Sequence, residues 1–438
     1  MAARPEVVVI GAGPAGLATL KALADRGIAA VCFDAGDRPG GLWVFEGPGS
    51  GAYRTLHLNT SRTRTQFADF PMPADWPDYP RHDRVLAYLT DYADHFGLRT
   101  AIRHRHVVTR VGRTAQGWSV EADGPDGPVS AKARAVVVAS GHNSVPRWPD
   151  PLPEGLTADQ SHSHDYRDPA QLAGRRVLVV GGGNSAMDIA ADASQVAERT
   201  ILSLRRGVWI VPKYLFGHPS DTLNGALAKR LPWRLRQAVS QTMLRLATGH
   251  PTAHGLPAPG HGFLQDHPTL SDVLLTRVGH GDITIRGAIA RADGRTVEFA
   301  DGAREEVDLV VWCTGYRPEI PFLDPPALGD QVPLYRHVFH LDEPGLFFVG
   351  LMQSTGAALP IVEAQARLVA AYLAGEFALP APEQQRADRA ARLRQAHRRW
   401  ADRRTAMRID FDAYLALAAD ELRKGRLRHG TTWPEVTR

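Results

Sequence analysis

Glycines at a spacing that suits nucleotide phosphates stand in two places in this 438-residue chain. The first set is Gly11-x-Gly13-x-x-Gly16, within "EVVVIGAGPAGLATLKAL". Its first glycine permits a tight turn, its second lets a pyrophosphate approach the backbone, and its third lets a helix pack closely on a strand. The N-terminus of the following helix then offers unpaired N–H groups. We expect this first cradle to bind a dinucleotide through Gly11, Ala12, Gly13, Pro14, Ala15 and Gly16.

An acid follows the first set at the distance that such motifs require. Asp34 ends the next apolar segment, "IAAVCFD", about twenty residues after the glycines. A carboxylate there can accept hydrogen bonds from ribose hydroxyls, whereas it would repel a 2′-phosphate. The first cradle is therefore predicted to hold a dinucleotide without a 2′-phosphate.

The second set is Gly181-x-Gly183-x-x-Ala186, within "VVGGGNSAMDIA". Arginines replace the acid here, because the following apolar segment ends in "TILSLRRG", with Arg205 and Arg206. Guanidinium groups bind phosphate oxygens bidentately, so this second cradle favours NADPH over NADH. The candidate contacts are Gly181, Gly183, Asn184, Ser185, Ala186, Arg205 and Arg206.

Two different cradles in one chain indicate a hydride transfer between two cofactors. FAD in the first cradle and NADPH in the second form the natural pair, since the nicotinamide must pass its hydride to a flavin ring nearby.

Both cradles need a strand, a turn, a helix and a second strand, and the patterns at 6–34 and 176–204 supply them. We predict an α/β fold with two dinucleotide-binding, Rossmann-like domains. The NADPH domain, 166–276, is expected to be inserted into an FAD domain made of 1–165 and 277–438. Further strands are expected at "ARAVVVASG", "VDLVVWCTG" and "GLFFVGL", and helices near 83–96 and 360–375.

Two segments fall outside this pattern. Residues 220–270 are apolar and basic by turns, and we expect a helical insertion packed over a cofactor site. A membrane-surface helix is the alternative. From about residue 382 the chain is rich in Arg and Ala, which predicts solvated helices on the body of the protein.

Composition limits the function classes. The chain is 44% hydrophobic and 22% charged, with a formal net charge of +4, which is typical of a soluble globular protein and gives no nucleic-acid footprint. Cys32 and Cys313, the only cysteines, stand in apolar runs and are expected to be buried structural thiols. Without a CxxC pair, a flavin disulfide reductase and a cysteine metal site are excluded. No signal peptide or membrane span is evident, which predicts a cytoplasmic protein.

The remaining motifs resemble the class B flavin-dependent monooxygenases, and among them the flavin-containing monooxygenases that oxygenate nitrogen and sulfur. The resemblance covers essentially the whole chain. It is carried by "GGLW", "LHLNTSR", "FADFPMPADWPDYPRHDRVLAYLTDYADHFGL", "SHSHDYRDP", "WCTGY", "GLFFVGLMQSTGAALPIVEAQA" and "MRIDFDAYLALAADEL".

The family fingerprint FxGxxxHSxxY is matched only in its second half. His162, Ser163 and Tyr166 fit it, whereas Leu156 and Ala158 stand at its Phe and Gly positions. We expect this departure to alter how the two domains hinge. The Baeyer–Villiger relatives end the fingerprint in Trp, so Tyr166 favours oxygenation of a heteroatom.

The resemblance also implies site residues. Asn59 is the candidate catalytic residue, hydrogen bonding near the reactive face of the flavin in a polar, water-poor pocket; an ordinary turn asparagine is the alternative. Gln365 either approaches the flavin or is a polar residue on a helix surface. His162 and His164 are interpreted as linker residues, and no metal site is expected. The other implied cofactor contacts are Gly41, Leu42, Trp43, Thr60, Val108 and Thr314.

By the same resemblance, NADPH reduces FAD, oxygen adds to the reduced flavin as a C4a-hydroperoxide, and NADP stays bound as a lid. A nitrogen or sulfur atom of a small molecule then attacks the distal oxygen. The cofactor carries the chemistry, so no catalytic triad is needed. Baeyer–Villiger oxygenation of ketones and a flavoprotein that senses NADPH without turnover are the alternatives. O2 and a small-molecule substrate are the expected partners, without nucleic acid, and a homodimer is the assembly to test.

Overall fold

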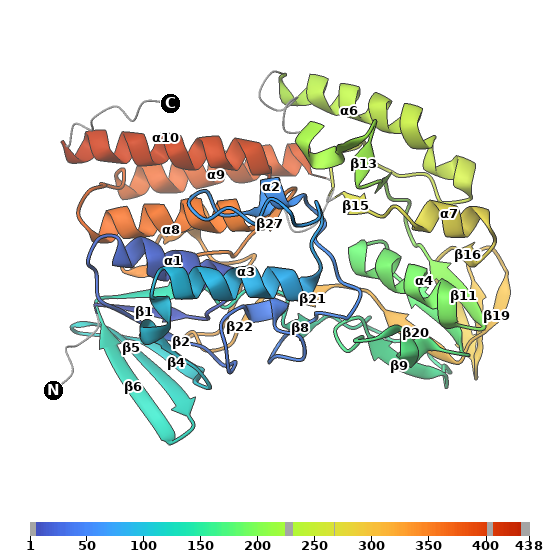
Figure 1. Ribbon diagram of the computed structural model, residues 1–438, viewed down its shortest axis with the longest axis horizontal. Coiled ribbons are helices and arrows are strands. Elements are labelled where there is room, and N and C mark those ends of the chain that lie inside the picture. Colours follow the sequence, from blue (N-terminus) through green and yellow to red (C-terminus); the bar gives the residue numbers. More distant parts are fainter. Residues whose placement is uncertain (1–5, 224–230, 267, 401–405, 431–438) are drawn as a thin grey trace.

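The computed structural model describes residues 6–223, 231–266, 268–400 and 406–430, which form two α/β units side by side (Figure 1). Each unit is built on one sheet that contains a βαβ cradle. The first sheet has the order β24-β25-β26-β7-β1-β2-β3 and the second the order β16-β11-β10-β20-β9. The expected pair of Rossmann-like units is therefore present.

The first unit forms because four consecutive apolar residues make β1 (Val7–Ile10), which is buried on both faces. Helix α1 (Pro14–Ala24) connects it to the parallel β2 (Ala30–Phe33). Helix α8 (Leu359–Leu373) packs against α1, so a segment from the far end of the chain completes this layer (Figure 1). The other strands of the sheet are β3 (Ile102–Arg103), β7 (Ala135–Val138), β24 (Leu334–Tyr335), β25 (Phe339–His340) and β26 (Leu346–Phe348).

The second unit repeats the plan with β10 (Arg176–Val180), α4 (Asn184–Val196) and β11 (Arg199–Ser203). Its sheet is wider than the expected range 166–276. It also takes β9 (Asp159–His162) from before that range, and β16 (Ile283–Arg286) and β20 (Leu309–Trp312) from after it. An apolar run such as "VDLVVWCTG" predicts a buried strand, but it does not show which of the two sheets the strand joins.

The expected insertion, residues 220–270, is preceded by β12 (Ile210–Val211) and ends with β15 (Thr269–Leu270), and these two short strands pair in parallel. A hairpin of β13 (Tyr214–Leu215) and β14 (His218–Pro219) follows β12. Helix α6 (Trp233–Thr248) lies along the outer edge of the second unit in Figure 1. Residues 224–230 of the expected insertion lie outside the described residues.

Helix α9 (Pro382–Arg399) is largely solvated, as expected, and buries only Gln385, whereas α10 (Phe411–His429) is less solvated than expected. Helix α10 packs on α8, and its Glu421 is only 1% exposed. That carboxylate accepts hydrogen bonds from Tyr335 Oη at 2.8 Å and from the Arg336 guanidinium. The inner face of α10 is therefore part of the first unit.

Smaller elements complete the fold. They are α2 (Arg62–Thr65), α3 (His82–His95), α7 (Leu274–Gly279), the 3₁₀ turns η1 (Gly41–Trp43), η2 (Leu98–Ala101), η3 (Pro169–Leu172) and η4 (Pro251–His254), the three-stranded sheets β4 (Val107–Thr114), β5 (Gly117–Gly124), β6 (Gly127–Ala133) and β17 (Ile289–Asp293), β18 (Thr296–Phe299), β19 (Arg304–Glu306), and the pairs β8 (Val145–Pro146) with β21 (Tyr316–Arg317), β22 (Glu319–Ile320) with β23 (Ala327–Leu328), and β27 (Gln353–Ser354) with β28 (Arg408–Ile409).

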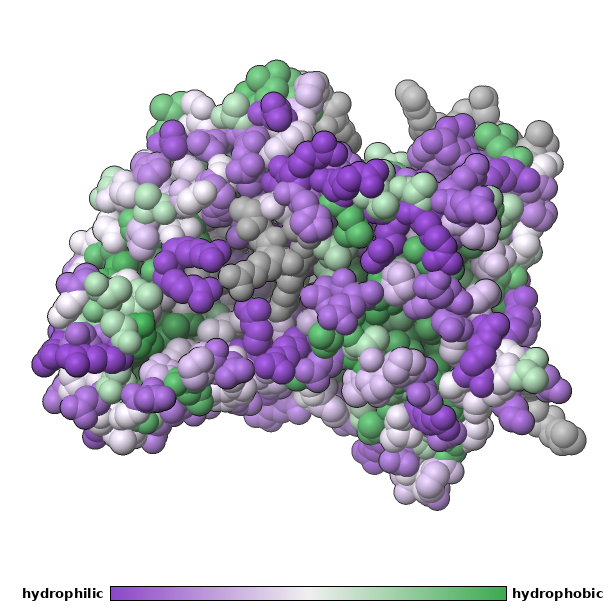
Figure 2. All heavy atoms as spheres, turned by 180° about the vertical axis from the view of Figure 1, so that it is seen from behind, coloured by the Kyte–Doolittle hydropathy of each residue, from purple (hydrophilic) through white to green (hydrophobic). Residues whose placement is uncertain are grey.

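No helix in the described part of the chain combines the length and the apolar character needed to cross a bilayer. On the face shown in Figure 2, polar and apolar side chains are interspersed over both units.

Candidate functional site

The first cradle leaves no room for a side chain at two of its glycines, Gly11 and Gly16. Gly11 has a φ of +98°, and a Cβ there would come within 2.7 Å of the Ala139 carbonyl oxygen. A Cβ on Gly16 would overlap the carbonyl oxygen of Gly11. Helix α1 begins after Gly13 without a capping side chain and without an acid in its first turn. Its N-terminal N–H groups are thus suited to an anionic group.

Asp34 lies against this turn and is 8% exposed. Its Oδ2 accepts a hydrogen bond from the Ala12 N–H at 2.6 Å, and its Oδ1 accepts one from the Gly36 N–H at 2.9 Å. The carboxylate is therefore fixed at the end of β2, beside the cradle, which is the location that the spacing predicted.

The "GGLW" motif, residues 40–43, forms the 3₁₀ turn η1 and the residue before it. The Gly40 N–H donates to the Ala12 carbonyl at 3.0 Å, which ties this turn to the first cradle. Trp43 packs against the main core, whereas Leu42 is 43% exposed. Val108, on β4, packs against the core cluster that contains Phe33.

The second cradle is equally tight at its turn and open in front. Gly181 has a φ of +147°, and a Cβ there would overlap the Cys313 carbonyl oxygen. Gly183 precedes α4, and no atom of the described residues lies within 4 Å of a Cβ placed on it. Helix α4 again begins without a capping side chain and without an acid in its first turn.

The side chains of the second cradle have different surroundings. The Asn184 Oδ1 accepts a hydrogen bond from the Leu270 N–H at 2.8 Å, so this oxygen is held by β15. Ser185 is partly buried in the first turn of α4, and Ala186 is fully buried against β10.

Arg205 and Arg206 follow the end of β11 and are both exposed. Neither forms an ion pair or a side-chain hydrogen bond with another described residue. Two unpaired guanidinium groups beyond the second strand of the cradle fit a phosphate on the ribose. The donors and the open space therefore fit a 2′-phosphorylated dinucleotide here, as the first cradle fits one with free ribose hydroxyls.

Asn59 lies in a loop of the first unit that the second unit contacts. The Leu58 N–H donates to the Pro80 carbonyl at 2.9 Å, and Thr60 Oγ1 shares a hydrogen bond of 2.8 Å with Thr65. The Asn59 side chain is partly buried and makes no hydrogen bond to any other described residue. A turn asparagine usually bonds its own backbone, and Asn59 does not, so its amide is available to a ligand. Its catalytic role stays a prediction.

Gln365 is fully buried, so its interpretation as a polar residue on a helix surface is wrong. Its Oε1 accepts the Gly350 N–H at 2.8 Å, and its Nε2 donates to Tyr414 Oη at 3.1 Å. A Cβ on Gly350 would be 3.1 Å from the Ala15 Cβ. Gln365 thus supports the first cradle through Gly350. Only the resemblance pointed to a position near the cofactor, because the helical periodicity of the sequence does not show whether Gln365 is buried.

Thr314 uses its polar groups within the protein. Its hydroxyl donates to the Arg147 carbonyl, and its own carbonyl accepts from the Arg147 guanidinium at 2.8 Å. A contact of Thr314 with the cofactor stays a prediction, as do the other individual contacts.

Two carboxylates on α4, the partly buried Asp188 and the buried Asp192, join the units, and sequence reasoning did not single them out. Tyr53 donates to Asp188, while Thr55 at 2.6 Å and Tyr166 at 2.7 Å donate to Asp192. Burial raises the pKa of both carboxyls. In the sequence, the only feature that could have pointed to this pair was the spacing of four residues within one helix. The loop that leads to Asn59 is thereby fixed to the helix of the second cradle.

The linker fingerprint folds into a compact cluster. His162 is fully buried, and its Nδ1 accepts the His164 N–H at 3.0 Å. Both rings pack edge-on against Tyr316, and burial lowers the pKa of both. Leu156 and Ala158 pack into the core beside β18. The effect of these two residues on a hinge motion stays a prediction.

The two thiols differ in exposure. Cys32 is fully buried, as expected, and burial raises its pKa. Cys313 is only partly buried at the residue level, and burial of its thiol raises the pKa to about 12. Both thiols are therefore protonated at neutral pH and poor nucleophiles.

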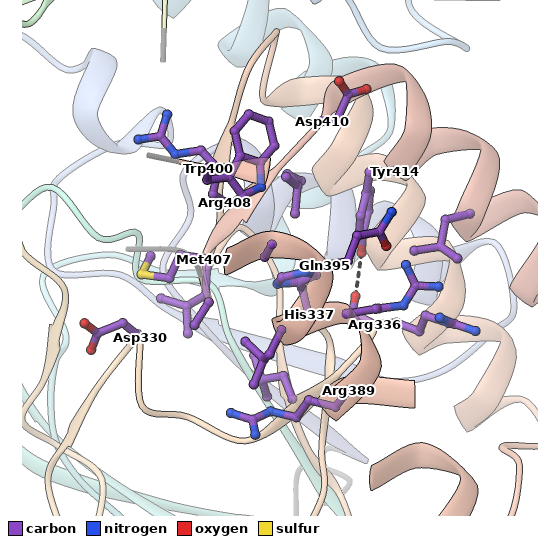
Figure 3. Close-up of a pocket in the computed structure, with 18 of the residues that line it drawn as sticks. Asp330, Arg336, His337, Arg389, Gln395, Trp400, Met407, Arg408, Asp410 and Tyr414 are labelled. Carbon is purple, nitrogen blue, oxygen red and sulfur yellow. Dashed lines mark hydrogen bonds between the residues drawn. The ribbon is translucent and has the colours of Figure 1, made fainter. Parts of the chain in front are cut away.

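A cavity of about 200 Å³ lies between the turn that follows β24 and helices α9 and α10 (Figure 3). His337 and Tyr414 line it, and both contact the Gln365 amide. Its Arg336 pairs with Glu421 and with Asp388, so this charge is compensated inside the protein. The cavity does not include the glycines of either cradle.

Comparisons with known proteins agree with this geometry. The family model described as FMO-like, flavin-binding monooxygenase-like, matches residues 4–424. Flavin-containing monooxygenase 5 of Oryctolagus cuniculus is 34% identical over 398 residues, covering 85% of this chain and 74% of the relative. Dimethylaniline monooxygenase [N-oxide-forming] 2 of the same species is 32% identical over 407 residues, covering 87% and 76%.

Among solved structures, the S-allyl-L-cysteine S-oxygenase from Allium sativum matches with a TM-score of 0.70 and 25% identity, over 98% of this chain and 89% of that chain. The two cradles and the match over nearly the whole chain agree with the resemblance found in the motifs. The protein belongs to the flavin-binding monooxygenase-like family and is an FAD- and NADPH-dependent monooxygenase.

Proposed function

We propose that the enzyme inserts one oxygen atom of O2 into a nitrogen or sulfur atom of a small molecule. The observation that carries this proposal is the pair of unlike cradles, with the unbonded Asn59 amide on a loop that contacts the unit of the second cradle. When bound, the flavin supplies the oxygen chemistry and NADPH the hydride. The names of two similar proteins support nitrogen and sulfur as the atoms oxygenated, since one is an N-oxide-forming monooxygenase and the other an S-oxygenase.

In this proposal the residues of the chain bind and orient the two cofactors. The backbone of Gly11, Gly13 and Gly16 holds a pyrophosphate, and Asp34 accepts hydrogen bonds from ribose hydroxyls. Arg205 and Arg206 hold the 2′-phosphate of NADPH, and Gly183 leaves room for its pyrophosphate. In this proposal these residues replace water around the phosphates and the ribose hydroxyls of the two cofactors.

Asn59 is proposed to hydrogen bond at the reactive part of the site and to keep water from it. Its amide is partly buried and makes no hydrogen bond to a described residue, so binding a ligand there breaks no bond within that part of the protein. An amide can both donate and accept, which suits a polar site that must exclude water.

Three further features of the protein belong to this proposal. We propose that the NADPH-binding unit coincides with the second sheet, from β9 to β20, rather than with 166–276. Cytoplasmic location and a homodimer stay predictions, and size-exclusion chromatography with light scattering tests the latter.

The deciding experiment measures NADPH oxidation by the FAD-loaded protein with tertiary amines, thioethers, indole and ketones, and identifies each product by mass spectrometry. We expect N-oxides and sulfoxides, formed only when NADPH, O2 and enzyme are all present. Catalase is included so that free hydrogen peroxide does not oxidise the thioethers. Esters or lactones from ketones as the main products would favour a Baeyer–Villiger enzyme instead. NADPH oxidation that no substrate stimulates would favour a sensor.

A further inference from the structure

A carboxylate of the second unit holds the loop that carries Asn59. The Oδ2 of Asp221 accepts hydrogen bonds from both the N–H of Ser61, at 2.7 Å, and its hydroxyl, at 3.0 Å. Ser61 is 1% exposed, stands two residues after Asn59, and precedes α2. Bonds to an ionised acceptor are about twice as strong as neutral ones. Asp221 is thus a strong tether of this loop.

The second oxygen of Asp221 makes the tether unusual. Its Oδ1 is buried and has no hydrogen-bond partner among the described residues. A buried polar atom without a partner costs free energy. The carboxylate therefore makes its hydrogen bonds to Ser61 alone. A carboxylate with both oxygens hydrogen bonded would stabilise the fold more.

The turn that presents Asp221 is docked on the same loop region. Tyr79 Oη donates to the Lys213 carbonyl at 2.5 Å, and Tyr214 Oη donates to Asp78 at 2.8 Å. The Lys213 ammonium lies 5.0 Å from the centre of the Tyr79 ring. The hairpin from β13 to β14 is therefore fixed against residues 78–79, which lie next to the Asn59 loop through the bond between Leu58 and Pro80.

The hairpin is also attached to the second cradle. The Ser271 N–H donates to the Val211 carbonyl at 3.0 Å, next to the β12–β15 pair. In β15, the Leu270 N–H donates to Asn184 Oδ1 at 2.8 Å, and the Thr269 hydroxyl donates to the Gly182 carbonyl at 2.9 Å. A continuous series of bonds thus connects the second cradle to Ser61.

We propose that Asp221 is a positioning residue for Asn59, through which the nucleotide unit orders the Asn59 loop when the two units are docked. This inference rests on the role proposed for Asn59. It explains why one carboxylate directs both of its hydrogen bonds to a residue beside Asn59.

The first test needs no activity. Hydrogen–deuterium exchange of peptides that cover residues 57–66 is compared in the wild type, Asp221→Ala, Asp221→Asn and Tyr214→Phe. Losing a charge-assisted bond should speed exchange of the Ser61 amide about tenfold in Asp221→Ala. Asp221→Asn keeps an acceptor oxygen and should restore part of the protection. Tyr214→Phe is the matched control, because it removes one exposed bond of the same hairpin, which the bond from Tyr79 to the Lys213 carbonyl still fixes, and it leaves Asp221 and Ser61 in contact.

The second test uses the FAD-loaded enzyme with a substrate from the screen above. In Asp221→Ala the share of oxidised NADPH that ends as hydrogen peroxide should rise severalfold, with FAD content and the KM for NADPH within twofold of wild type. Asp221→Asn should fall between the two, and Tyr214→Phe should match wild type. A residue that only stabilised the fold would lower FAD content and melting temperature instead.

Unchanged exchange in Asp221→Ala, or equal loosening by Tyr214→Phe, overturns the proposal. Faster exchange with an unchanged peroxide share overturns it too. If Asn59→Ala also leaves the peroxide share unchanged, the failure lies in the role proposed for Asn59.

Discussion

The backbone of Gly41 lies directly against that of Gly13: a Cβ on Gly41 would come within 2.9 Å of the Gly13 Cα. The same contact is looser in the other direction, because a Cβ on Gly13 would meet the Gly41 Cα at 3.5 Å, an ordinary distance. Gly13 also has a φ of −72°, which any residue adopts. The protein alone thus tolerates a methyl group at Gly13, and only a ligand at the cradle would be crowded by it.

We therefore expect Gly13→Ala to fold normally and to bind FAD at least about tenfold more weakly, since the methyl group stands where the pyrophosphate must approach the backbone. FAD titration followed by flavin fluorescence measures the affinity, and circular dichroism checks the fold. Gly41→Ala is the contrasting variant, because its φ of +58° and the short contact strain the fold itself. Unaltered FAD affinity in Gly13→Ala would contradict the assignment of the first cradle.

Asn59→Ala should still oxidise NADPH but should pass less oxygen to substrate, because the amide is proposed to order the reactive part of the site. We expect product per NADPH to fall several-fold and hydrogen peroxide to rise by the matching amount. Both are quantified in the same reaction, by mass spectrometry and by a peroxidase assay. Thr60→Val is the control in the neighbouring position, since the Thr60 hydroxyl bonds to Thr65 within the loop. Equal coupling in Asn59→Ala and wild type would exclude the role.

The cradles could be predicted from sequence because each depends on residues close along the chain. Turn, helix start and acid all follow within about twenty positions, so spacing alone fixes them. The sheet that β20 joins depends on pairing with β10, from Val177 to Leu309, and no local pattern records such a partner. The same limit hid the bond between Asp221 and Ser61, which are 160 positions apart. Gln365 illustrates a further limit, because helical periodicity does not show whether a polar residue of a helix is buried.

His337 predicts a pH dependence of stability. Burial, together with the positive charges of Arg392, Arg389 and Arg336, lowers its pKa from 6.5 to about 4. The unfolded chain takes up the proton below pH 6.5 and the folded protein does not until pH 4, so this stability is complete above 6.5 and is lost as the pH falls to 4. At about 1.4 kcal/mol for each pKa unit, the loss approaches about 3 kcal/mol.

His337→Asn should flatten this dependence. Asparagine suits the left-handed backbone there, at a φ of 58°, and it does not titrate. We expect the melting temperatures of the two proteins to differ little at pH 8, with the wild type falling more steeply between pH 6.5 and 4. Parallel curves would show that His337 is protonated equally in the folded and unfolded protein.

The choice of reductant should depend on Arg205 and Arg206. Both are exposed beyond β11 without a partner among the described residues, so their charge is available to a 2′-phosphate. A charge-assisted hydrogen bond contributes roughly 1.5–3 kcal/mol, and exposure and salt reduce that contribution. Replacing both with Ala should raise the KM for NADPH about tenfold and leave that for NADH within twofold. Steady-state kinetics at two salt concentrations measure both, and the difference between the coenzymes should shrink at high salt.

Arg199→Ala is the matched control, because Arg199 stands at the opposite end of β11 and pairs with Glu305 at 2.8 Å. If the wild-type enzyme used NADH and NADPH with equal efficiency, the two arginines would not bind the 2′-phosphate.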